Sequence, residues 1–125
     1  MDIELLEVST DDHIVKSEIF SFSSEFFLRL SKSDFSKLGV SVKKSLKIDG
    51  ESIDFKVCEL SPFIRGSIVR FLEELLVDIV TETLDRLGKS PSKREFEEYT
   101  YDLNELASFI RELRVEGYSH LKRVG

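Results

Sequence analysis

The longest hydrophobic pattern in the chain runs from Ser61 to Gly88 and predicts a single long helix. Its apolar residues recur at steps of three and four, which is the spacing of residues on one helix face. A surface helix needs an apolar arc of only about 100° to pack on its own core. Two adjacent stripes widen that arc, so we expect one stripe inside the domain and one against another chain. The first stripe consists of Ile64, Ile68, Phe71, Leu75 and Ile79, and the second of Val69, Leu72, Leu76, Val80 and Leu87.

In the first part of the chain, hydrophobic and polar residues alternate, which is typical of strands. Two strands are expected, Ile3 to Val8 and Ile14 to Phe22, and the alternation continues through Phe26, Leu28 and Leu30. We therefore expect this part of the chain to form a sheet.

The period changes after Leu30. Ser31 or Ser33 can cap a short helix, and Phe35 and Leu38 would form its apolar face. Gly39 would end this helix, because glycine readily adopts the left-handed conformation after a helix.

The firmest local signal is the dipeptide Asp49-Gly50 between two apolar segments, Val42 to Ile48 and Ile53 to Val57. This dipeptide suits a two-residue hairpin turn in which both central residues have positive φ. The hydrophobic pattern agrees with the register that such a turn imposes. That register sets Leu46 against Ile53 and Val42 against Val57.

Ser61-Pro62 is suited to begin the long helix, because proline is favoured at the first helical position. Ser92 and Glu95 have the spacing of a capping box and predict a second helix of roughly twenty residues that ends near Gly117. The apolar face of that helix comprises Phe96, Tyr99, Leu103, Leu106, Ile110 and Leu113, and Tyr118, Leu121 and Val124 are expected to dock the tail.

These elements predict an α+β fold. Residues 1–60 would form a small antiparallel β lobe with one short helix, and residues 61–125 a helical lobe of two long helices. A chain of 125 residues is close to the commonest domain size, so one compact body is the simplest expectation.

Charged residues make up 34% of the chain, glutamine is absent, and Asn104 and Met1 are the only residues of their types. This bias toward charge predicts a thermophilic, archaeal source. The lone Cys58 has no internal disulfide partner and is expected to be a buried thiol. The acidic first residues do not form a signal peptide, and the charges within 61–88 argue against a membrane span, so we expect a cytoplasmic protein.

The net charge of −6 is unevenly distributed and argues against a dedicated duplex-DNA binder. Residues 1–30 hold seven acids and two bases, whereas residues 31–60 hold six lysines and five acids. Lys43, Lys44 and Lys47 form a possible surface for nucleic acid or an acidic partner. The simpler interpretation is that they solvate the outer face of the sheet.

Catalytic chemistry is almost absent from the sequence. His13, His120 and Cys58 fall short of a zinc-site spacing, and both histidines are expected to be ordinary exposed residues. No phosphate-binding loop, nucleophile elbow or dinucleotide fingerprint occurs. We therefore expect no catalytic residue, cofactor or metal, and a protein that is not an enzyme.

Phe63 and Phe109 depart from the main stripes and, if exposed, would be interface anchors, because aromatic residues are enriched where partners meet. The pattern predicts a homo- or hetero-oligomer with no membrane contact. The expected partner interface comprises Phe63, Ile64, Ile68, Phe71, Leu72, Leu75, Leu76 and Phe109.

The order of elements resembles a GINS replication-factor subunit of the archaeal type with its β domain first. The residues that carry the resemblance are the segment 27–38, Ser61-Pro62-Phe63 followed by Leu72 and Leu75, and the segment 103–114. The chain lacks tryptophan, and its helical lobe is short for the family. The resemblance implies a non-enzymatic scaffold that assembles with a sister subunit and binds the MCM helicase and a RecJ-like protein.

Part of the same segment is also similar to AbrB-type swapped-hairpin transcription factors. The similarity lies in Leu28 to Lys32 followed by Lys37-Leu38-Gly39-Val40, and it implies a DNA-binding homodimer. A viral or orphan protein that inhibits or bridges a host protein would present the same surface. Direct contact with nucleic acid stays open at this point, and a small enzyme is the last alternative.

Overall fold

The computed structural model describes residues 2–88, 92–115 and 117–123. Val124 and the side chain of Tyr99, which the sequence predicts to pack, lie outside the described part of the chain. The elements in chain order are β1 (Asp2–Val8), β2 (Ile14–Ser21), α1 (Ser24–Lys32), the 3₁₀ helix η1 (Asp34–Lys37), β3 (Ser41–Ile48), β4 (Glu51–Glu59), α2 (Pro62–Leu87), α3 (Lys93–Arg114) and β5 (His120–Arg123).

The strands form one five-stranded antiparallel sheet, which confirms the predicted α+β class. Their order is β2-β1-β5-β4-β3, so the short C-terminal strand lies in the middle of the sheet. At one end the turn between β1 and β2 approaches β3, because Lys47 N donates to Asp12 O at 2.8 Å. Sequence periodicity did not predict β5.

The β3–β4 hairpin has the predicted turn and register. Asp49 and Gly50 have φ of 51° and 83°, as a two-residue turn with positive φ at both positions requires. The predicted cross-strand pairs are both present, Leu46 with Ile53 and Val42 with Val57.

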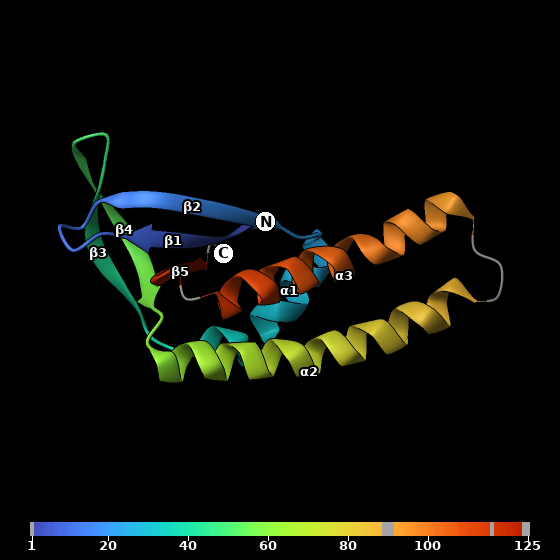
Figure 1. Ribbon diagram of the computed structural model, residues 1–125. Helices are drawn as coiled ribbons and strands as arrows, with labels where there is room; N and C mark the ends of the chain where they lie inside the picture. The colour runs from blue at the N-terminus through green and yellow to red at the C-terminus, as the bar shows by residue number, and fades with distance from the viewer. Residues whose placement is uncertain (1, 89–91, 116, 124–125) are drawn as a thin grey trace.

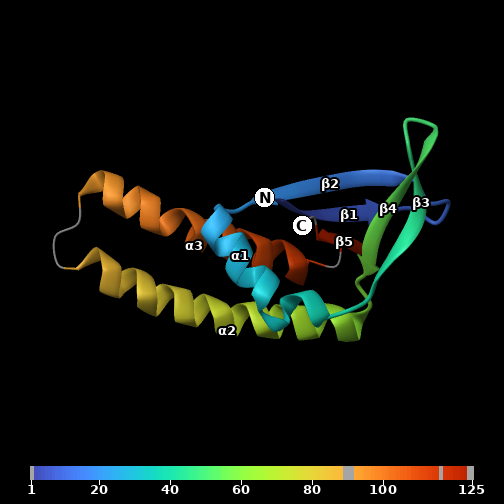
Figure 2. The same ribbon diagram turned by 180° about the vertical axis from the view of Figure 1, so that it is seen from behind.

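The helices cover one face of the sheet, and α2 and α3 form a hairpin that extends beyond it (Figures 1 and 2). Both helices begin as predicted: Ser61 Oγ accepts from Ile64 N at 3.3 Å, and Ser92 Oγ accepts from Glu95 N at 3.1 Å. The second helix ends at Arg114, slightly before the expected position near Gly117.

The prediction of a strand through Phe26, Leu28 and Leu30 is wrong, because these residues lie in α1. Ser23 caps this helix by accepting from Phe26 N at 3.2 Å. Phe26 and Leu30 are one helical turn apart and both are buried, whereas Leu28 is exposed. The prediction that follows is confirmed: Ser33 caps the short helix η1, and Gly39 has a φ of +74°.

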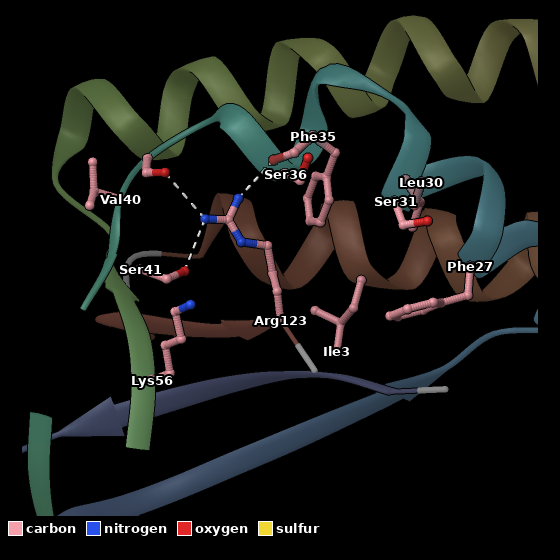
Figure 3. Close-up of a pocket in the computed structure, with 11 residues that line it drawn as sticks. Ile3, Phe27, Leu30, Ser31, Phe35, Ser36, Val40, Ser41, Lys56 and Arg123 are labelled. Carbon is pink, nitrogen blue, oxygen red and sulfur yellow. Dashed lines mark hydrogen bonds between the residues drawn. The ribbon is translucent and has the colours of Figure 1, made fainter. Parts of the chain in front are cut away.

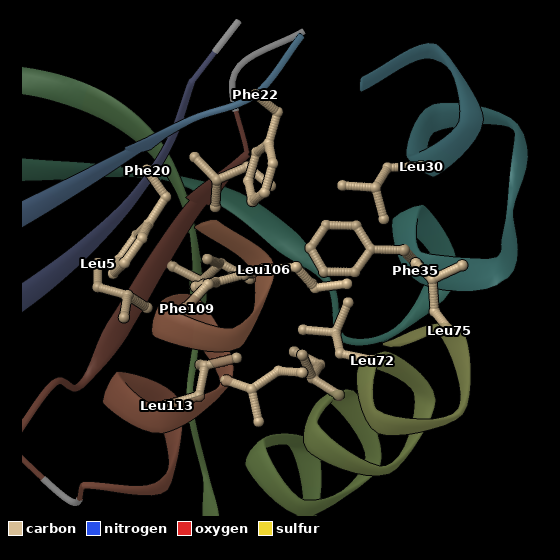
Figure 4. Close-up of a cluster of buried hydrophobic side chains, with 14 of the residues drawn as sticks. Leu5, Phe20, Phe22, Leu30, Phe35, Leu72, Leu75, Leu106, Phe109 and Leu113 are labelled. Atoms are coloured by element: carbon tan, nitrogen blue, oxygen red, sulfur yellow. The ribbon is translucent and has the colours of Figure 1, made fainter. Parts of the chain in front are cut away.

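The main core joins the two segments that the sequence predicts as separate lobes (Figure 4). Phe20 of β2 contacts Phe109 of α3 with ring centroids 5.1 Å apart, and Leu121 of β5 belongs to the same cluster. The boundary near residue 60 therefore separates segments of the chain but not two cores. A smaller cluster of Leu6, Leu46 and Val57 is also buried within the sheet.

Candidate functional site

Half of the expected partner interface is internal core. Ile68, Leu72 and Phe109 are fully buried and Leu75 is nearly so, which corrects their expected place on a partner surface. The buried face of α2 combines residues from both predicted stripes, because the helix turns the centre of its apolar arc to the core. Ile64, Phe71 and Leu76 are half-buried and pack against this core, whereas Phe63 is 80% exposed.

The side of α2 opposite the core carries three exposed hydrophobic residues, which we call the α2 outer strip: Phe63, Val77 and Leu84. Their side chains are 80%, 64% and 65% exposed. They are spaced by multiples of seven residues, so at 3.6 residues per turn they lie within roughly 60° of one another around the helix axis. The strip therefore forms one line along the outside of the helical hairpin.

Acidic residues flank the α2 outer strip on one side. Glu74, Asp78 and Asp85 are exposed, and each lies roughly 60–100° around the axis from Val77. On the other side, Glu73 is paired with Arg114 of α3 at 2.7 Å. Arg70, which is exposed, occupies the seven-residue position between Phe63 and Val77, so the strip is apolar apart from one cation and has a negative border.

The three lysines suggested for a nucleic-acid or acidic partner do not form a purely basic surface. Lys43 pairs with Asp54 at 3.4 Å, and Lys44 pairs with Asp12 at 3.5 Å. Lys47 is exposed near the hairpin turn. Acidic neighbours therefore offset much of the charge that a phosphate backbone would require.

A cavity of about 470 Å³ opens between the α1–η1 segment and the sheet (Figure 3). Its apolar wall includes Ile3 of β1, Phe27 of α1 and Phe35 of η1. Ser31 and Ser36 add hydroxyl groups on the helical side. Small-molecule sites in proteins have volumes of about 300–1,000 Å³ and similar mixed walls.

Two cations line this cavity, Lys56 of β4 and Arg123 of β5, and none of the described residues that line it is acidic. The β4–β5 ladder pairs Glu59 with His120 and Cys58 with Leu121, and the same register continued by two residues would set Lys56 opposite Arg123. Lys43 of β3 lies opposite Lys56 of β4 in the sheet register. Lys43, Lys56 and Arg123 therefore follow one row across the sheet.

Arg123 connects the cavity wall to the loop before β3. Its Nη1 donates to the carbonyl oxygens of Phe35 and Leu38, both at 2.7 Å, and its Nη2 donates to Gly39 O at 3.3 Å and Ser41 Oγ at 3.2 Å. Burial lowers the pKa of the guanidinium. Within residues 2–88, 92–115 and 117–123, no carboxylate pairs with Arg123.

A second, polar cavity of about 310 Å³ lies between α1 and the two long helices. Its charged groups have partners: Arg29 contacts Glu82 at 2.5 Å, Arg86 lies 3.9 Å from Glu25, and Asp102 accepts from the backbone amide Ser23 N at 2.8 Å. These internal pairs join α1 to α2 and α3, and they leave little unbalanced charge for a ligand.

The two histidines differ in environment. His13 pairs with Asp11 at 2.9 Å near the surface, but His120 is only 7% exposed, so the expectation that both are exposed is wrong for His120. Burial lowers the pKa of His120, Lys44 lowers it further, and Glu59 and Asp12 raise it. In the described residues no cluster of His, Cys, Asp and Glu has the geometry of a metal site.

Sequence reasoning missed Lys56 and Arg123 as a pair, because they lie far apart in the chain and meet only through β5.

Scans against models of protein families, against curated proteins and against solved structures found no match to this chain. In the part of the chain that is described, no helix combines the length and hydrophobicity that crossing a membrane requires.

Proposed function

We propose that the protein is a non-enzymatic binding module that docks a basic amphipathic helix of a partner protein on the α2 outer strip. The observation that carries this proposal is the line of Phe63, Val77 and Leu84 on the side of α2 away from the core. Exposed apolar residues that follow one line mark interaction surfaces more often than scattered ones do. Their spacings of fourteen and seven residues suit a helix packed alongside α2, with Arg70 at the intermediate position.

The acidic residues beside the α2 outer strip favour a basic partner. Glu74, Asp78 and Asp85 would attract lysine or arginine side chains that flank the apolar residues of the docked helix. Phe63 and Leu84 are about 30 Å apart along the axis at 1.5 Å per residue, so a helix of about 21 residues spans the strip.

A pair of synthetic peptides tests this proposal. Both are 21 residues long with leucine at positions a and d of the heptad, and one has lysine where the other has glutamate. We expect the lysine peptide to bind with a micromolar Kd and the glutamate peptide to bind at least tenfold more weakly, measured by isothermal titration calorimetry. Equal affinity for both peptides would overturn the proposal.

Substitutions in the α2 outer strip test whether the peptide binds there. Val77→Asp with Leu84→Asp should weaken the lysine peptide at least tenfold while circular dichroism stays native. Val42→Asp is the matched control, because Val42 is 54% exposed on β3 and should leave binding unchanged. The wild type could instead form a homodimer that is lost in the double variant. That result would show that the strip binds a second copy of this chain, and it would overturn the choice of partner.

Recovery of the natural partner connects this surface with the family resemblance. Affinity purification from the source organism is done with the wild type and with the Val77→Asp/Leu84→Asp variant. A protein lost with the variant is the docked partner. A replication-complex subunit in that position would support the GINS-like scaffold, and any other protein would remove that assignment while the docking surface stands.

A further inference from the structure

We propose that the cavity between the α1–η1 segment and the sheet binds a small amphipathic organic anion, with its acidic group at Lys56 and Arg123 and its apolar body against Phe27 and Phe35 (Figure 3). This site is separate from the α2 outer strip, and it does not depend on the proposed docking of a partner helix.

The first support is the charge of the wall. The 11 residues that line the cavity include Lys56 and Arg123 but no aspartate or glutamate. The protein as a whole has a net charge of −6, so a wall with cations alone is opposite in sign to the average surface. A concave site with one sign of charge concentrates ligands of the opposite sign.

The second support is the state of Arg123. Arg123 is half-buried, and its guanidinium donates to three carbonyl oxygens and one hydroxyl, all of which are uncharged acceptors. Partly buried charges in proteins are normally paired with an opposite charge. Among the described residues Arg123 has no such pair, and an anion in the cavity would supply it.

The third support is the position of Lys56. It follows Arg123 in the row of cations across the sheet, and its neighbour in that row, Lys43, is already paired with Asp54 at 3.4 Å. Figure 3 shows the Lys56 side chain on the same side of β4 as the Arg123 guanidinium. Lys56 is therefore placed to contact the acidic group of a ligand directly, whereas Arg123 stabilises it from the wall.

The apolar part of the site decides the kind of anion. Ile3, Phe27, Leu30 and Phe35 form a continuous hydrophobic wall beside the two cations, and Ser31 and Ser36 lie on the helical side. Inorganic phosphate would leave this wall exposed to water. A medium-chain carboxylate would cover it, because burial of each methylene group is favourable.

Three eight-carbon ligands that differ only in their head group test the proposal: octanoate, 1-octanol and octylammonium. Binding to the full chain is followed by ¹⁵N–¹H correlation spectra. We expect octanoate to bind most tightly, with shifts at Ser31, Ser36 and Val40, and octylammonium to bind at least tenfold more weakly. Octylammonium binding as tightly as octanoate, or shifts confined to α2 and α3, would overturn the proposal.

Lys56→Gln tests the role of the cation while leaving the four contacts of Arg123 in place. It should weaken octanoate about tenfold, the order expected for one charge-assisted contact, and leave 1-octanol within about twofold. Lys93→Gln is the matched control, because Lys93 is exposed at the far end of the helical hairpin. Equal weakening of octanoate by both variants, or of octanol as much as octanoate by Lys56→Gln, would show that the row of cations does not recognise the head group.

Discussion

Replacement of Gly39 with alanine tests the close packing of the loop between η1 and β3. Gly39 lies between η1 and β3 with a φ of +74°, and an added Cβ would collide with Cys58 Sγ and lie 2.9 Å from Ile64 Cγ2. Cys58 is 1% exposed and Ile64 packs against the main core, so neither side chain can move aside without disturbing its neighbours.

Two opposing effects set the magnitude. Positive φ costs a residue with a Cβ about 1–2 kcal/mol, and overpacking in a dense core costs a further ~1–3 kcal/mol. Alanine also lowers the conformational entropy of the unfolded chain relative to glycine, which stabilises the folded protein by about 0.4–1 kcal/mol. We therefore expect Gly39→Ala to lower the free energy of unfolding by about 1–4.5 kcal/mol.

Gly50→Ala separates the collision from the backbone strain. Gly50 has a φ of +83°, but no atom lies within 4 Å of the position that its Cβ would occupy. Gly50→Ala therefore introduces the backbone strain of a positive φ without a collision, and it should lower the free energy of unfolding by about 0–1.5 kcal/mol. The difference between the two variants, about 1–3 kcal/mol, then measures the contact with Cys58 and Ile64.

Urea denaturation followed by far-ultraviolet circular dichroism measures both variants. With a slope of about 2 kcal/mol per molar urea, the midpoint of Gly39→Ala should lie about 0.5–1.5 M below that of Gly50→Ala. Cys58→Ala combined with Gly39→Ala should be less destabilised than the sum of the two single variants, because the colliding sulfur is removed. Equal midpoints for Gly39→Ala and Gly50→Ala would refute the close packing of Gly39 against β4 and α2.

The remaining predictions concern the core and the buried histidine. Leu72→Ala should lower the free energy of unfolding by about 2–5 kcal/mol in urea denaturation, because Leu72 is fully buried, whereas Leu84→Ala should change it by less than about 0.5 kcal/mol; similar losses for both would contradict the orientation of α2. The pKa of His120 is lower in the folded protein than its ordinary value of 6.5, so the unfolded chain takes up this proton first as the pH falls. Its contribution to stability should thus be fully present above about pH 6.5 and decline as the pH falls through that value toward the lower folded pKa. Denaturation midpoints between pH 8 and 5.5 should decline less in His120→Asn, and an unchanged decline would show that other groups cause it.

Local signals predicted much of the fold, because they depend on residues close together in the sequence. The turn at Asp49-Gly50 and the cap at Ser61 are examples, and both are confirmed. The prediction of a strand around Leu28 is wrong because the spacing of Phe26, Leu28 and Leu30 also fits a strand, and only the cap at Ser23 and the burial of Phe26 and Leu30 distinguish the helix.

The candidate sites were less predictable, because they depend on contacts between distant segments. Four residues of β5 are too few to show a period, and their place between β1 and β4 is set by the sheet. Lys56 and Arg123 come together only through that pairing. The α2 outer strip could not be identified from the sequence, because only the position of the core shows which side of α2 faces solvent.

The central position of β5 also has a consequence for how the protein folds. The β1–β2 and β3–β4 hairpins each join strands that are adjacent in sequence, and both can form early. The sheet is continuous only after β5 inserts between them, and the pairing of Ile3 with Arg123 closes a loop of nearly the whole chain. Closing so long a loop is entropically costly and slows folding. Until residues 120–123 leave the ribosome, the inner edges of both hairpins stay unpaired, and this nascent state is where strand-exchange aggregation should concentrate.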